Sequence, residues 1–186
     1  MTGSVVFWGA LAVLLFWSVG AYNRLIRLRA AVIAAFAAID EPFKHHIDLV
    51  KTGFQQPNDN GFAATKETGP DHPFFLLAGL RGAAEQFDAC LKAARSQPLA
   101  APAMSALQTA HQTMHVAWSR VQNRPHDLAG SLLPEPLPAR WHHICANADI
   151  ACAEFNRQVL SYNDAIAQFP AALLAWLFGF VAAKSV

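Results

Sequence analysis

The clearest pattern of apolar positions lies toward the C-terminus. From residue 141 to residue 173, large apolar or small side chains recur at alternating steps of four and three. This spacing keeps them on one face of a helix, as in helical bundles and coiled coils. Shorter stripes of the same kind cover residues 76–94 and 104–121, and residues 25–39 repeat every seven positions. The chain therefore carries four segments that are typical of amphipathic helices.

Proline marks the limits of these segments. The eleven prolines lie mostly between the stripes or at their ends, where a missing backbone N–H disturbs a helix least. The helices predicted on this basis cover about 23–51, 74–97, 103–124 and 139–170. The intervening segments are rich in Asn, Asp, Gly and Pro, and we expect them to form loops. Alanine, at 36 residues, also favours helix. The predicted fold is all-α, with an antiparallel four-helix bundle at residues 23–170.

Residues 1–22 are expected to form a membrane anchor. The 18 residues from position 5 to position 22 carry no charge, and as a helix they would span about 27 Å, close to the hydrocarbon thickness of a bilayer. A basic segment typical of cleaved signal peptides is missing before them. Arg24, Arg27 and Arg29 follow directly, so the positive-inside rule places the N-terminus outside and the bundle in the cytoplasm. We expect the anchor helix to continue into the bundle.

The last segment, residues 171–186, forms an apolar tail. Its first 13 residues would span only about 20 Å as a helix, which is too short to cross a membrane. They are nevertheless too apolar to be left in water. We expect the tail to lie against the anchor or in the membrane interface, where Trp176 and Phe178 would offer an aromatic surface.

Composition and motifs argue against several classes of function. The net charge of +1 excludes an electrostatically driven nucleic-acid binder. Neither a glycine-rich phosphate loop, a GxSxG element nor a Glu-x-x-His pair occurs. We assign no catalytic residue, cofactor or small-molecule substrate. With 54% hydrophobic and 15% charged residues, the expected partners are membrane lipid and other membrane or membrane-associated proteins.

Both ends of the bundle resemble a known family. YNRLIRLRAAV begins at Tyr22, FKHHIDLV follows at residues 43–50, and FNRQVLSYNDAIAQFP at residues 155–170 precedes an FGF tail ending at residue 180. These stretches resemble the LemA family of bacterial membrane-anchored helical proteins. The resemblance implies a single-pass protein of the bacterial inner membrane with a four-helix domain and no established catalytic activity. A family turn is missing after Val50, and Cys152 and Ala153 stand where a basic residue is usual, so the chain is similar to a divergent member.

Asparagines beside aromatic residues are the first candidate functional motif. They form the pairs Tyr22–Asn23, Phe155–Asn156 and Tyr162–Asn163. Buried asparagine in a bundle needs a hydrogen-bond partner and often sets the register of the helices. We expect Asn156 and Asn163 to face the first helix in such a structural role. A surface that binds a partner protein is the alternative.

Histidines form the second candidate group, because eight is a high number for 186 residues. His111 and His115 are spaced i, i+4, which allows two imidazoles to reach one metal ion. The adjacent pairs His45–His46 and His142–His143 could meet across the bundle at the end far from the membrane, where a transition-metal cluster is the alternative function. The alternative for each is an ordinary hydrogen-bonded core histidine. Cys90, Cys145 and Cys152 occupy stripe positions and are expected to be buried, inert thiols.

Taken together, these patterns favour a non-enzymatic, membrane-anchored scaffold or interaction protein. An accessory subunit of a larger membrane complex is one alternative, supported by the apolar tail. A metal-binding sensor or enzyme built on the histidine pairs is the other.

Overall fold

A computed structural model describes residues 2–54, 73–124, 133, 135–169 and 171–186. Every regular element in these ranges is a helix, which confirms the all-α prediction. The helices are α1 (Thr2–Gly53), α2 (Pro73–Ser96), α3 (Ala101–Gln122), α4 (Leu137–Ala167) and α5 (Ala171–Phe178).

Prolines lie inside the helices more often than we predicted. Helices α3 and α4 begin two residues earlier than expected, with Pro102 and Pro138 in their first turns. Proline fits there because the first N–H groups of a helix have no partner within it. Pro42 lies inside α1, which continues without a break to Gly53. The loops predicted from Thr52 to Pro73 and from Arg124 to Pro138 fall mostly outside the described residues, although their ends at Thr52, Pro73 and Pro138 lie in helices.

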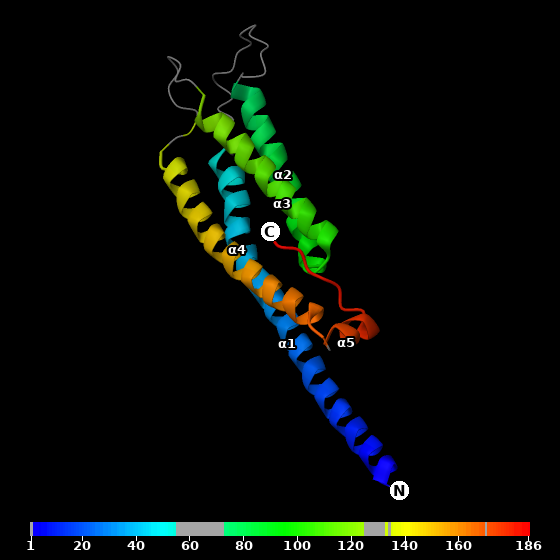
Figure 1. Cartoon of the computed structure of the whole chain (residues 1–186). Coiled ribbons are helices and arrows are strands. Elements are labelled where there is room, and N and C mark those ends of the chain that lie inside the picture. Colours follow the sequence, from blue (N-terminus) through cyan, green and yellow to red (C-terminus); the bar gives the residue numbers. More distant parts are fainter. Residues whose placement is uncertain (1, 55–72, 125–132, 134, 170) are drawn as a thin grey trace.

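Helix α1 has two parts that differ in burial. In the first part, Val13, Leu14, Leu15 and Phe16 are each at least 60% exposed. From Leu25 onward, one face is buried, with Val32, Ile39 and Phe43 almost completely enclosed. The first part projects beyond the other helices (Figure 1). Within the described residues, α1 is the one helix long and apolar enough to cross a membrane, judged by length and composition.

The packed helices, which we call the helical core, are joined through three main contacts. Helix α1 packs along α4, α2 packs along α3, and α1 also contacts α2. The ring of Phe36 lies 6.0 Å from that of Phe155, and the ring of His46 lies 4.7 Å from that of Trp141. The residue numbers of the contacted side chains therefore fall along α4 as those of their partners rise along α1. Ile39, which lies between Phe36 and His46 on α1, is fully buried.

The tail departs from a simple helix. Helix α5 ends at Phe178, and Gly179 follows with a φ of +68°, a conformation that glycine adopts without a steric penalty. Phe180 then donates its N–H to the carbonyl of Ala175 at 2.8 Å. Residues 180–186 turn back in extended form along the helical core, as the red segment of Figure 1 shows.

Candidate functional site

Asn156 and Asn163 of α4 hold the extended C-terminal segment. The side-chain amide of Asn163 donates to the carbonyl of Ala183 at 2.8 Å and accepts from the N–H of the same residue at 2.9 Å. Asn156 binds Val186 in the same way, with both distances at 2.9 Å. Each amide thus pairs with both main-chain groups of one residue, as a neighbouring β-strand would. We call Asn156 and Asn163 the asparagine clamp.

The spacing of the asparagine clamp matches that of its two targets. Seven residues along a helix rise about 10.5 Å, and three residues of extended chain cover about 10 Å. Ala183 and Val186 are three residues apart, so both can be held at once. Val181 lies between the end of α5 and Ala183 in the sequence. Its carbonyl accepts a hydrogen bond from the hydroxyl of Tyr162 at 3.1 Å.

The prediction that the two asparagines face helix α1 is therefore wrong. Phe155 and Tyr162 are the residues buried in the helical core, and each following asparagine turns toward the tail. Sequence reasoning missed this partner because main-chain groups of an extended segment have no residue signature. The available signal for this partner was the repeat of an aromatic–Asn pair, at Phe155–Asn156 and again at Tyr162–Asn163.

Tyr22 joins the tail to helix α1. Its ring centroid lies 4.9 Å from that of Phe178 and 6.2 Å from that of Phe180. The guanidinium of Arg29 lies 6.0 Å from the centre of the Phe180 ring. The tail therefore contacts α1, the helix predicted to carry the anchor, which is one of the two positions that we expected for it. Asn23 and Trp176 are exposed, and Trp176 keeps 80% of its surface free.

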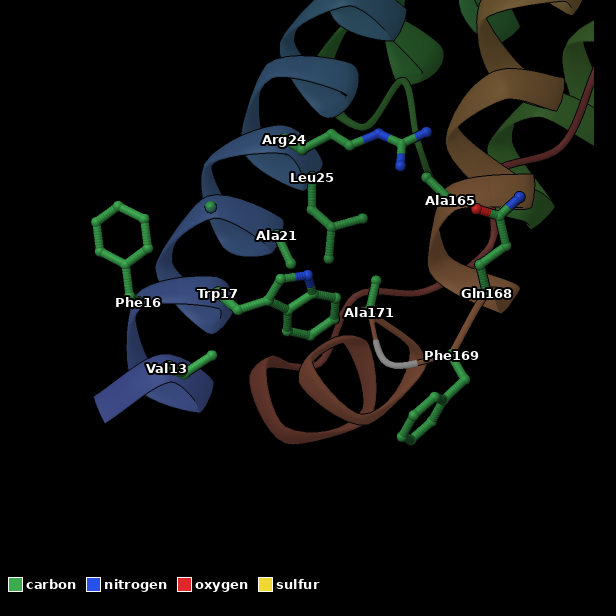
Figure 2. A pocket seen from close by; sticks show the side chains of 11 residues that line it. Val13, Phe16, Trp17, Ala21, Arg24, Leu25, Ala165, Gln168, Phe169 and Ala171 are labelled. Atoms are coloured by element: carbon green, nitrogen blue, oxygen red, sulfur yellow. The ribbon is translucent and has the colours of Figure 1, made fainter. Parts of the chain in front are cut away.

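A groove of about 460 Å³ lies beside this contact, between α1 and the junction of α4 with α5. Figure 2 shows Trp17 and Leu25 of α1 on the side facing Ala171. The lining is mostly apolar, and Arg24 is the one charged residue in it. An apolar groove with a single cation at its edge is chemically suited to contact with lipid.

A second polar cluster lies inside the helical core. It contains His46 from α1, His111 and His115 from α3, and Cys145 from α4, and we call it the His–Cys cluster. The Nε2 atoms of His111 and His115 are 3.0 Å apart, so the i, i+4 pair shares one face as predicted. Nε2 of His46 lies 3.3 Å from Sγ of Cys145. Ligand atoms of His46, His115 and Cys145 all lie within 4.8 Å of one another.

The predicted meeting of the two adjacent histidine pairs is wrong. His45, His142 and His143 are exposed, and His143 instead lies 3.4 Å from the amide of Asn147. Neighbouring residues on a helix point about 100° apart, so only one member of such a pair can face inward. On α4, the residues that face the helical core beside His46 are Trp141 and Cys145, which are one turn apart. Cys145, which we expected to be inert, takes the place expected for a histidine.

Aromatic rings enclose the His–Cys cluster. Trp118 and Trp141 stack with centroids 4.1 Å apart and planes 5° apart, and the ring of His115 lies 5.2 Å from Trp141. The ring of His111 lies 4.7 Å from that of Phe43 and 5.2 Å from that of Phe87. The imidazoles are therefore held in a largely apolar environment.

This environment favours the uncharged forms of the cluster. Burial, with the nearby His111 and His115, lowers the pKa of His46 to about 3. Burial, with His115, lowers the pKa of His111 to about 4. Burial and the charge of Asp149 raise the pKa of the Cys145 thiol to about 11. At neutral pH the imidazoles are therefore uncharged, and each ring keeps a lone pair on its unprotonated nitrogen. Nδ1 of His46 is buried and has no hydrogen-bond partner among the described residues.

Comparison of the chain with protein-family models, curated proteins and solved structures gave no match. The resemblance to the LemA family therefore stays a prediction, and the function must be argued from the residues themselves. Three features are available for that argument: the exposed apolar part of α1 with its groove, the asparagine clamp and the His–Cys cluster.

Proposed function

We propose that this chain is a non-enzymatic, membrane-anchored scaffold of LemA type: an antiparallel four-helix bundle that holds partner proteins at the bacterial inner membrane. The observation that carries this proposal is the continuity of α1. One helix of 52 residues is exposed and apolar over its first part and buried in the helical core over its second. An anchor that shares a helix with the domain would hold that domain at a fixed height and tilt above the membrane.

The membrane-proximal surface supports contact with lipid. The groove beside Trp17 and Phe169 is apolar, and Arg24 lies where an anionic headgroup would be attracted. Arg27 and Arg29 extend the positive charge along α1 just beyond the uncharged stretch. By the positive-inside rule this asymmetry supports a cytoplasmic location of the bundle.

Reporter fusions test this orientation. A reporter active only in the cytoplasm should work when it is fused after Val186. The fusion leaves the bonds of Val186 to Asn156 intact because both use main-chain atoms. Activity from a periplasmic reporter alone would reverse the orientation and place the partners outside.

Helix α5 favours a second candidate function, an accessory subunit of a larger membrane complex. Its outer face leaves Leu173, Trp176 and Leu177 exposed, at 62%, 80% and 64%. Aromatic and aliphatic side chains in one patch are typical of the centre of a protein interface. In this case the partner would itself be embedded in the membrane beside α1.

Co-purification in mild detergent tests both functions. We expect Trp176→Ser with Leu177→Ser to reduce partner recovery at least several-fold if α5 contacts a subunit, without loss of helix content. The matched control is Val116→Ser with Ile150→Ser, which removes exposed apolar side chains from α3 and α4 instead. Partner recovery that falls only in the control variant would favour a scaffold that binds through the helical core. Recovery of no partner with any variant would contradict both functions.

A further inference from the structure

We propose that the His–Cys cluster is a zinc site, in which His46, His115 and Cys145 bind one ion and His111 supplies the fourth ligand. This inference is independent of the proposed function, because it rests on residues in the interior of the helical core. It assigns a ligand chemistry to three histidines that the packing brings together and to a cysteine that the sequence left without a role.

The geometry is close to that of a tetrahedral site. With Zn–N near 2.05 Å and Zn–S near 2.3 Å, neighbouring N and S ligands lie about 3.6 Å apart and two N ligands about 3.3 Å apart. The His46–Cys145 distance is 3.3 Å and the His111–His115 distance is 3.0 Å. The ligand atoms of His46, His115 and Cys145 already lie within 4.8 Å of one another, so small side-chain rotations would complete the site.

The donor set selects the metal. Three imidazole nitrogens and one thiolate suit zinc, a borderline-soft ion that occurs with four protein ligands in structural sites. On binding, a Zn–S bond forms and the thiol proton of Cys145 leaves to the buffer, while each histidine contributes a lone pair. His115 and Cys145 are partly exposed, which gives an ion a way in, whereas His46 is completely enclosed.

The competing explanation is a metal-free group of core histidines. It accounts for the His111–His115 contact, in which one ring can donate to the other. It does not account for His46, which among residues 2–54, 73–124, 133, 135–169 and 171–186 has the sulfur of Cys145 beside Nε2 and no partner for Nδ1. A buried polar group that lacks a partner costs about 1–3 kcal/mol. Coordination through Nε2 would replace its weak sulfur contact by a strong bond, whereas coordination through Nδ1 would satisfy the unpaired nitrogen itself.

The ion would also join helices that are otherwise weakly connected. Helix α3 packs along α2 in the described residues, and it reaches α1 and α4 mainly through side chains such as His115 and Trp118. Ligands from α1, α3 and α4 around one ion would cross-link the two helix pairs. Zinc should therefore raise the thermal midpoint of the whole domain rather than order a single loop.

Metal titration of the full chain in detergent tests the site. The reduced protein, treated with a chelator and desalted, is titrated with Zn²⁺ and in parallel with Co²⁺. We expect one equivalent to bind, a thermal midpoint that rises by several degrees, and a cobalt spectrum with tetrahedral d–d bands and a thiolate-to-cobalt charge-transfer band.

The variants identify the ligands. Cys145→Ser should abolish the charge-transfer band and weaken binding at least about 100-fold, since even outer-shell changes weaken metal sites 10–100-fold. His46→Leu should weaken it to a similar extent. The matched controls are Cys152→Ser, two turns further along α4, and His142→Gln, an exposed histidine, and both should bind as the unaltered chain does. Helix content measured by circular dichroism checks that each variant folds.

Two results would overturn the zinc site. One is the lack of any equivalent bound by the folded, reduced protein. The other is binding that Cys145→Ser leaves unchanged and that His142→Gln removes, which would locate the ion on the exposed histidines.

Discussion

The asparagine clamp and the His–Cys cluster differ in how far their polar side chains are satisfied by hydrogen bonds within the chain. Both place polar side chains on or beside the apolar stripe of a packed helix. In the clamp, Asn156 and Asn163 have their amide donors and acceptors bonded to main-chain groups of the tail. In the cluster, Nδ1 of His46 is buried and finds no hydrogen-bond partner in the part of the chain that the structure describes. A polar group fully bonded within the chain indicates a structural role, whereas an unmet one indicates a ligand.

The two regions also differ in what they connect. The clamp ties α4 to a segment 20 to 30 residues further along the chain, so it organises local structure next to α5. The cluster joins His46 to Cys145, which are 99 residues apart, and draws in α3 as well. Loss of the clamp should therefore free the tail, while changes in the cluster should act on the packing of the helical core.

Asn163→Leu should give the largest change in stability. The substitution leaves the N–H and carbonyl of Ala183 without partners, and Ala183 is only 6% exposed. We expect the free energy of unfolding to fall by about 2 kcal/mol, measured by urea denaturation in detergent. The tail should also become sensitive to protease. Asn147→Leu, which changes an exposed asparagine of the same helix, is the control and should have little effect.

A double-variant cycle checks the cause of that loss. Once residues 182–186 are removed, Asn163→Leu should cost far less, because its partner is gone. An equal cost with and without the tail would show that Asn163 acts through another contact.

His46→Leu should change stability in the opposite direction when zinc is removed. The substitution eliminates a buried nitrogen that has no partner among the described residues, and leucine can fill much of the same volume beside Trp141. We expect the metal-free protein to gain about 1 kcal/mol in a chelator-containing buffer, since replacing unsatisfied buried polar groups by apolar ones is often favourable. His45→Leu, at the exposed neighbouring position, should leave the free energy of unfolding unchanged. A loss of more than 1 kcal/mol in His46→Leu would mean that the cluster is well satisfied without metal.

The two regions also show how far the sequence could be interpreted. Periodicity predicted the four long helices, because their apolar stripes are what the helical core buries. It also predicted that His111 and His115 share a face, since that follows from spacing within one helix. The stripe also put Cys145 rather than His142 on the inward face of α4, but it could not predict that this cysteine lies beside His46 and His115, because the level at which α4 packs against α1 and α3 is set by tertiary contacts. The partner of Asn163 was equally hidden, since main-chain groups can belong to any residue.

The smallest effect is expected at Lys184, which tests whether charge or the amides hold the tail. Its Nζ donates to Oγ of Ser105 on α3 at 2.7 Å, but the bond is exposed to water. Exposed polar contacts contribute little because water replaces either partner, so Lys184→Ala should alter the free energy of unfolding by less than about 0.5 kcal/mol. Protease sensitivity of the tail should also stay as in the unaltered chain. If Lys184→Ala released the tail as readily as Asn163→Leu does, the link to α3 would be what holds the segment, and the bidentate amide pairs would be a consequence of its position rather than the cause.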